Sequence, residues 1–371
     1  MSSTRRVRLL AKLLREILFP GLLLLLAWAG TGCESSGYYR QAAAGQFQIL
    51  TGARSVKGLL ADPQTPPELQ SRLRLLLDLR AFAAKELCLP TDGHYLSYTD
   101  LKRPHAVWTV QAAPEFSLRP KSWWYPVVGS ATYRGYFSEA AARRYAARLA
   151  REHFDVVVEE VDAYSTLGWF QDPALNTFLS YPEKDLARTI FHELGHQRLY
   201  IAGDTNFNEA FAVTVEKEGL RRWLLARGNT ADFEKYQARQ AQKKQFIDLV
   251  IAARRQLAAV YGEAADRMAA APGSDEEKRR RKAAVLEQLR QGHAKLKEQW
   301  GGRSPYDDWF AEPLNNARLN TVATYFDLVP AFERLLAQNH GDLPRFYEAL
   351  RRLRRLSNEQ RHQELLAAMK S

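Results

Sequence analysis

The sequence predicts an α+β fold, in which a front half with a mixed β-sheet is followed by a predominantly helical back half. Between residues 94 and 182, aromatic and β-branched residues alternate with Pro and Gly, which is typical of short strands. Beyond residue 183, nearly every segment has helical spacing and ends at turn residues. With 371 residues, 46% of them hydrophobic, the chain can bury a substantial core.

The first 32 residues have the layout of a signal peptide. A basic opening precedes an apolar run at 17–29, which Pro20 interrupts and which is short for a membrane span. The following "AGTGC" resembles a bacterial lipobox, in which Cys33 would carry lipid and begin the mature chain, although Gly30 stands where Leu is usual. Plain secretion and an uncleaved anchor are the alternatives, and all three place the rest of the chain outside the cytoplasm.

Cysteine content and charge agree with export. Lipid on Cys33 would leave Cys88 as the only thiol, so no intramolecular disulfide could form. The net charge of +11 falls once the leader, with five basic residues and one acidic residue, is removed. The densest basic run, "EEKRRRKAAVLEQLR", is interleaved with Glu and indicates a solvated helix rather than a nucleic-acid site. We therefore expect a lipoprotein of the bacterial cell envelope, anchored to a membrane and without a nucleic-acid partner. The sequence does not distinguish the inner from the outer membrane, and it does not define the oligomeric state.

The chain divides into three parts after the leader. Residues 33–66 are expected to form a tether and a first helix, residues 67–182 a helix plus a mixed-sheet subdomain, and residues 183–371 a helical subdomain. Residues 67–88 place apolar side chains at helical spacing, which predicts the helix that opens the second part.

Four segments of the second part predict strands, and one predicts a crossover helix. The strand patterns are "HAVWTVQAA", "PVVGSATYRGYF", "FDVVVEEVDAYS" and "NTFLSYP", and residues 138–153 form the helical pattern between them. The last strand would offer an edge with which an extended peptide could pair. In the third part, the predicted helices are 184–201, 206–227, 231–271, 275–299, 313–338 and 342–369.

The stretch "HELGH" within the first of these helices predicts a metal site. Four helical residues turn the chain by about 400°, so the side chains of His192 and His196 lie on one face and can reach one ion. Glu193 lies at the edge of that face, where its carboxylate can take a proton from a zinc-bound water. The alternative is a pair of ordinary helix histidines. Leu186 and neighbouring apolar residues form a stripe that would pack this helix on the sheet.

A catalytic zinc ion needs a third protein ligand. Leu199 and Ala202 stand where the metzincin pattern requires Gly and His. Glu209 follows in the next helix, after a short turn, and two antiparallel helices would bring it opposite the histidines. Asp204 in the turn is the rival ligand, but it suits a helix cap better than a metal. The favoured ligands are therefore His192, His196 and Glu209 around Zn²⁺.

The stretch "NEAFA" after an HExxH helix resembles the gluzincin peptidases, including the "NExFA" pattern of alanyl-type aminopeptidases, whose gap to the glutamate is longer. The chain is most similar to a bacterial family of zinc aminopeptidase lipoproteins. That resemblance rests on "GYYRQAAAGQFQIL", "YRGYF", "AYSTLGWFQDP", "FHELGHQRLY", "GDTNFNEAFA" and "LNNARLNTVATY", which extend over most of residues 37–340. It implies a metal-dependent peptidase, with Glu193 as the base.

Two further features of the sequence concern the details of the activity. Tyr325 and Tyr164 are candidates for stabilising the oxyanion, on residue type alone. The "GxMEN" stretch that binds the substrate amine in alanyl aminopeptidases is absent, so the sequence does not define which end of a peptide is attacked. We expect a zinc peptidase, in particular an aminopeptidase, that acts on peptides by Glu-assisted attack of a zinc-bound water. The alternative is a non-catalytic zinc-binding envelope lipoprotein, including a metal carrier.

Overall fold

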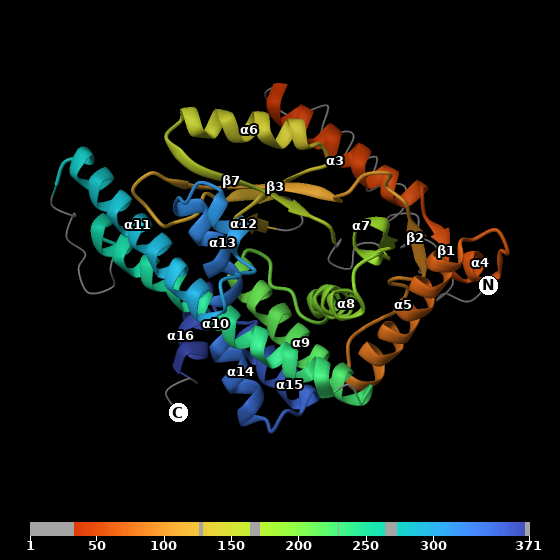
Figure 1. Cartoon of the computed structure of the whole chain (residues 1–371). Helices are drawn as coiled ribbons and strands as arrows, with labels where there is room; N and C mark the ends of the chain where they lie inside the picture. The colour runs from red at the N-terminus through yellow and green to blue at the C-terminus, as the bar shows by residue number, and fades with distance from the viewer. Residues whose placement is uncertain (1–32, 126–128, 164–170, 229, 264–272, 368–371) are drawn as a thin grey trace.

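The computed structural model of the protein describes residues 33–125, 129–163, 171–228, 230–263 and 273–367 (Figure 1). Small sheets occupy the N-terminal half and helices the C-terminal half, so the predicted α+β class is confirmed. The predicted signal peptide at 1–32 and the candidate Tyr164 lie outside the described residues. No helix within the described ranges is long and apolar enough to cross a membrane.

The described chain begins with helices. The helix predicted at 67–88 is α5, Pro67–Glu86, which has proline in its first turn, where the missing N–H costs nothing. Its buried residues, among them Leu73 and Leu76, follow helical spacing. Two other helices precede it: α3 (Cys33–Thr51) and α4 (Val56–Ala61).

The main sheet has the strand order β6-β3-β7, with β3 at Val107–Pro114, β6 at Arg134–Tyr136 and β7 at Phe154–Val161. Both outer strands are antiparallel to β3, so they run parallel to each other. The helix that connects them is α6, Glu139–Arg151, which confirms the predicted crossover helix.

The two faces of this sheet have different environments. Trp108 and Val110 of β3 pack with α6 in one apolar cluster, and Figure 1 shows α6 lying along that face. Thr109 and Gln111 alternate with them and face a cavity on the opposite side. The helical half of the protein lies across that cavity, so the sheet forms one wall of the candidate site.

A second sheet joins β1 (Arg54–Ser55), β2 (Ser97–Thr99) and β8 (Ala174–Leu175), with one antiparallel and one parallel pair. The prediction of a strand at "NTFLSYP" is wrong, because α7 occupies Asn176–Leu179. The start of this helix is held by Asn176, whose side chain accepts a hydrogen bond from the Leu101 N–H and donates one to the Arg103 carbonyl. This segment therefore offers no strand edge to a peptide. A third pair joins β4 (Trp123–Tyr125) and β5 (Gly129–Ala131).

The C-terminal helices follow the predicted order with additional breaks. The segment predicted as one helix at 313–338 is divided between α13 and α14, because Pro330 has no N–H to donate to the preceding turn. The segment at 342–369 is likewise divided, and the short α12 was not predicted. The helices are α8 (Glu183–Arg198), α9 (Thr205–Ala226), α10 (Thr230–Tyr261), α11 (Asp275–Gln299), α12 (Asp307–Ala311), α13 (Asn316–Phe326), α14 (Val329–Gln338), α15 (Leu343–Leu353) and α16 (Asn358–Ala367).

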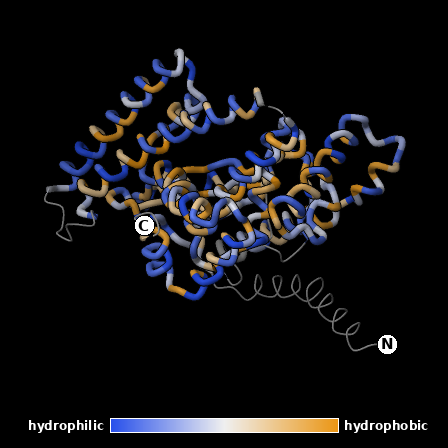
Figure 2. Tube along the Cα trace, turned by 90° about the horizontal axis from the view of Figure 1, so that it is seen from below, coloured by the Kyte–Doolittle hydropathy of each residue, from blue (hydrophilic) through white to orange (hydrophobic). Residues whose placement is uncertain are grey.

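The largest hydrophobic core lies among the helices, and Figure 2 shows hydrophobic residues gathered toward the middle of the molecule. The apolar stripe of α8, which includes Leu186 and Ile190, is fully buried in this core. Among the described residues, the strands of the main sheet contribute none to this core, so the predicted packing of the stripe is wrong for that sheet. The stripe shares the core with Ala174 and Leu175 of β8, and α8 contacts α5 and α9. The opposite face of α8 is thereby left to line the cavity below the sheet.

Candidate metal centre

The helix pair α8 and α9 positions the candidate ligands. A Cβ added to Gly195 of α8 would lie 3.4 Å from the Cα of Ala212, so the glycine permits close approach of the two helices. Asn208 holds the connecting loop, because its side chain accepts a hydrogen bond from the Ile201 N–H and donates one to the Ile201 carbonyl, both at 2.8 Å. These contacts fix the start of α9, which carries Glu209.

The structure brings the three predicted ligands together. Ligand atoms of His192, His196 and Glu209 all lie within 4.8 Å of one another, and these residues could hold a metal ion. The Oε2 atom of Glu209 is 3.4 Å from Nε2 of His192 and 3.7 Å from Nε2 of His196. Ligands of a tetrahedral zinc ion with bonds of about 2.0–2.1 Å lie about 3.3 Å apart, so the observed separations fit such a group.

The donor set also fits zinc in its chemistry. Two imidazole nitrogens and one carboxylate oxygen form the ligand set of many catalytic zinc sites. His192 directs Nδ1 to Glu216, at 3.2 Å, which leaves Nε2 for the centre. The Nδ1 atom of His196 is buried and has no hydrogen-bond partner among the described residues. His192 is thus held in orientation by a protein carboxylate, and His196 is held by packing.

Electrostatics at the centre favour a positive charge. Burial alone would lower the pKa of His192, but the carboxylates of Glu209 and Glu216 raise it to about 10. Burial raises the pKa of Glu209, yet the two histidines outweigh burial and hold it below its usual value. Burial lowers the pKa of His196 to about 4, so this imidazole stays neutral. A neutral imidazole and an ionised carboxylate are the states that bind a metal.

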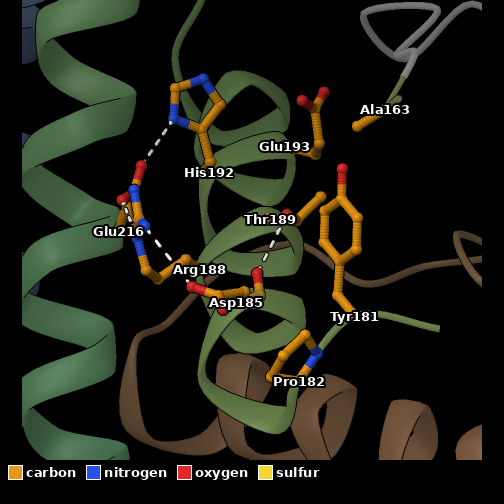
Figure 3. Close-up of a pocket in the computed structure, with 9 residues that line it drawn as sticks. All are labelled: Ala163, Tyr181, Pro182, Asp185, Arg188, Thr189, His192, Glu193 and Glu216. Atoms are coloured by element: carbon orange, nitrogen blue, oxygen red, sulfur yellow. Dashed lines mark hydrogen bonds and ion pairs between the residues drawn. The ribbon is translucent and has the colours of Figure 1, made fainter. Parts of the chain in front are cut away.

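Glu216 is a supporting residue that the sequence analysis missed. It lies two helical turns after Glu209 on α9, and its Oε1 accepts a hydrogen bond from Nε of Arg188 at 2.6 Å. Figure 3 shows the resulting chain of contacts from Arg188 through Glu216 to His192. Arg188 holds the pKa of Glu216 at about 2, against the effect of burial, so this carboxylate stays ionised. The seven-residue spacing from Glu209 was the available signal, because it places both carboxylates on one helix face.

Glu193 faces the same cavity as His192. Both residues line an open cavity of about 540 Å³. Figure 3 shows the two side chains extending from α8. Burial, followed by the charge of neighbouring carboxylates, raises the pKa of Glu193 to about 7, while His192 opposes that rise. A carboxylate with a pKa near neutrality can both accept and return a proton at physiological pH.

Asp204, the rival ligand, has a structural role. Its side chain caps α9 by accepting a hydrogen bond from the Phe207 N–H at 3.2 Å. It also pairs with Arg361 and with His362, both on α16. Its carboxylate is therefore occupied by the cap, by Arg361 and by His362, which excludes it from the metal set.

Tyr325 approaches the centre from α13. Its ring centroid is 6.5 Å from that of His192, and it lines a cavity of about 790 Å³ together with all three candidate ligands. The charge of Glu209, followed by burial, raises its pKa well above the usual value, so the hydroxyl remains protonated. Tyr200, another tyrosine that lines this cavity, was not considered from the sequence. Burial, followed by the charge of Glu209, raises its pKa to about 12.

The asparagines of "LNNARLNTVATY" fix α13 to the sheet. Nδ2 of Asn316 donates to the carbonyls of Pro114, Glu115 and Ser117 at 3.0–3.1 Å. Nδ2 of Asn320 donates to the Leu118 carbonyl at 3.0 Å. Both asparagines are buried. This anchorage sets the position of Tyr325 one turn further along the helix.

The sheet contributes an acidic group that the sequence analysis also missed. Glu159 of β7 lines the cavity, and its Oε2 accepts a hydrogen bond from Nε2 of Gln111 on β3 at 2.9 Å. Burial raises the pKa of Glu159, while Arg318 and Thr321 oppose that rise. Thr321 precedes Tyr325 by about one turn of α13, so Glu159 contacts the turn before the tyrosine that lies near His192.

The fold and this centre define a class of protein: an α+β protein with a cavity between a sheet and a helix pair, and a potential His₂Glu metal site in that cavity. Comparison with family models identifies it further. The chain belongs to the family described as "Putative aminopeptidase", whose model matches residues 37–365. Membership in this family indicates a peptidase that acts on peptides. No curated protein and no solved structure matched the chain.

Proposed function

We propose that the protein is a zinc-dependent aminopeptidase of gluzincin type. The observation that carries this proposal is the convergence of His192, His196 and Glu209, beside the free carboxylic group of Glu193, in one cavity. A zinc ion held by the three ligands would supply Lewis acidity, polarising a peptide carbonyl and acidifying water. The remaining chemistry is assigned to side chains of the chain itself.

In this mechanism, Glu193 moves the proton. Its carboxylate takes a proton from the attacking water as the water oxygen bonds to the peptide carbonyl carbon. The protonated carboxyl then returns that proton to the amide nitrogen while the C–N bond breaks, so the products are an amine and a carboxylic acid, whose proton passes to the amine to give an ammonium and a carboxylate. The position of Glu193 beside His192 on the cavity wall supports this role.

Tyr325 is assigned to the developing negative charge on the carbonyl oxygen. A phenolic hydroxyl that is already aimed at this position costs little reorganisation when the charge forms. Its place on the cavity wall, with its ring 6.5 Å from the ring of His192, supports the assignment.

Glu159 is assigned to the α-amine of the substrate. A protonated amine that enters the cavity needs an anionic partner, because burial of an unpaired charge is costly. In an extended chain, the amine of the first residue lies within about 3.6 Å of its own carbonyl. A carboxylate in the same cavity, beside the turn of α13 that precedes Tyr325, could therefore bind the amine while the carbonyl reaches the metal centre.

The proposal extends to location. The lipobox-like "AGTGC" supports lipid attachment at Cys33 and anchorage in the bacterial envelope. The matched family region begins only four residues later, at 37, so the anchor would be joined to the catalytic part by a short segment.

The test compares wild type with Glu193→Gln and Glu159→Gln on paired peptides with free and acetylated N-termini. We expect wild type to hold one zinc ion and to remove N-terminal residues from the free peptides only. Glu193→Gln should keep the metal and lose turnover on the order of 10²–10⁴-fold. Glu159→Gln should raise KM for free peptides and reduce the discrimination against acetylated ones.

The outcomes separate the alternatives. Wild-type protein that binds zinc but cleaves neither set would favour the non-catalytic zinc-binding lipoprotein. Cleavage of acetylated peptides as efficiently as free ones would instead assign an endopeptidase and remove Glu159 from its role.

A further inference from the structure

A third cavity lies beside the start of α8. It has a volume of about 1100 Å³ and lies between the start of α8, the end of α9, the first half of α10 and the segment 300–306. In Figure 1, α9 and α10 lie together beside α8. This cavity shares Pro182, Asp185 and Arg188 with the cavity of about 540 Å³ that His192 and Glu193 line. Arg188 also bonds to Glu216.

The lining of this cavity is strongly basic. Seven lysines and arginines face three acidic residues, and all three acidic residues have a cationic partner. Glu183 pairs with Arg227 at 3.0 Å, and Asp185 with Arg188 at 3.6 Å. Asp232 pairs with Lys235 at 3.7 Å. The cations for which no ion pair is formed with the described residues are Lys184, Arg239, Lys243 and Arg303.

Lys243 is the most informative of these cations. It is partly buried, and its Nζ lies 4.5 Å from the centroid of the Phe326 ring. That contact offers weak cation–π stabilisation but no counter-charge. Burial lowers the pKa of Lys243 to about 8, although Glu216 opposes the change. Glu216 compensates this burial only in part, because it forms no direct ion pair with Lys243, and a bound anion would compensate it further.

Two aromatic residues also line this cavity, and contacts with neighbouring side chains hold them in place. The ring of Tyr306 stacks on Phe246 with centroids 3.9 Å apart. The indole N–H of Trp300 donates to Oε1 of Gln245 at 2.8 Å. Both Tyr306 and Trp300 line the cavity, so its shape is held by residues from outside the basic cluster. The site is thus a defined cavity rather than a set of mobile surface lysines.

We propose that this cavity binds a small polyanion bearing phosphate or carboxylate groups. Its unpaired cations supply several charge-assisted donors in one concave site, which suits such a ligand. The volume is sufficient for a small molecule of this kind. The ligand would contact Arg188 from the side opposite Glu216. It would therefore lie one ion pair away from the candidate metal centre, beside the open cavity that His192 and Glu193 line.

Isothermal titration of the full metal-loaded chain provides the test, at constant ionic strength set with chloride. Inorganic phosphate and fructose 1,6-bisphosphate probe phosphate groups, and tricarballylate probes carboxylates. Lys243→Met removes the partly buried cation. Lys244→Met is the matched control, because Lys244 pairs with Asp248 one turn later on the same helix and does not line the cavity. Arg239→Gln is compared in the same way with Arg255→Gln, which also lies on α10 outside the lining.

We expect Lys243→Met to weaken binding of the bisphosphate about tenfold or more, as loss of one hydrogen bond to a charged group predicts. Lys244→Met should stay within about twofold of wild type. If the probe binds Lys243→Met as tightly as it binds wild type, the proposal is overturned. The probe would then bind at another site, such as the metal. No binding of any probe would overturn it as well. Neither result depends on peptide hydrolysis.

Discussion

The support of His192 by Glu216 leads to a prediction for metal affinity. The perturbation is Glu216→Gln, which keeps the size of the side chain but removes its charge. Nδ1 of His192 now lies 3.2 Å from the carboxylate, and Arg188 holds that carboxylate in place at 2.6 Å. The substitution converts a charge-assisted hydrogen bond into a neutral one and leaves Arg188 without its closest partner.

The size of the effect follows from these contacts. A hydrogen bond to a charged group contributes about 1.5–3 kcal/mol, and a neutral one about 1 kcal/mol. The difference is about 0.5–2 kcal/mol, to which imperfect orientation of the imidazole adds. At about 1.4 kcal/mol per tenfold, the zinc Kd should rise about 10-fold, within the range of about 10–100-fold typical of residues that orient metal ligands.

Competition against a chromophoric chelator measures this Kd. The matched control is Glu218→Gln on the same helix, because Glu218 pairs with Arg221 and Arg222, both at 2.7 Å, and does not line the cavity. Glu218→Gln should leave the zinc Kd unchanged. If Glu216→Gln also leaves it unchanged, with the fold intact by circular dichroism, Glu216 does not orient His192 and the reasoning is refuted.

Two further predictions concern turnover and packing. Tyr325→Phe should lower kcat for a free peptide by about 10²–10³-fold with little change in KM, because the lost hydroxyl acts on the transition state; a change confined to KM would contradict this. Gly219→Ala should destabilise the fold by about 1–3 kcal/mol in urea unfolding, since the added Cβ would lie 2.7 Å from Leu87 and Phe191. Gly37→Ala is its control, because nothing lies within 4 Å of the added Cβ; equal stability of both variants would disprove the steric argument.

Local patterns were sufficient for the parts of the fold that depend on near neighbours. The helix at Pro67–Glu86 and the crossover helix at Glu139–Arg151 follow from apolar spacing and caps within each segment. The stretch at Asn176–Leu179 was predicted wrongly, because three of its four residues are buried and its first residue bonds to a distant loop. Burial on all sides removes the alternation by which a strand and a helix are told apart.

In the candidate site, too, contacts between near neighbours in the sequence were predictable, and contributions from distant segments were not. The spacing of His192 and His196 determined a shared helix face, and the short turn before Glu209 predicted that α9 would return beside it. The contributions of Gln111 and Glu159 could not be predicted, because they come from strands more than thirty residues away along the chain, across the cavity.

The sequence by itself therefore determined the α+β class, and it predicted the helix pair, three candidate ligands and one candidate base, because these depend on periodicity over a few turns. Only the tertiary structure decided what surrounds them: the sheet wall with Glu159, the support of His192 by Glu216 and Arg188, and the basic cavity beside α8. The physical reason is that contacts between distant segments depend on how whole elements pack, and side-chain packing is not encoded in the spacing of any single element.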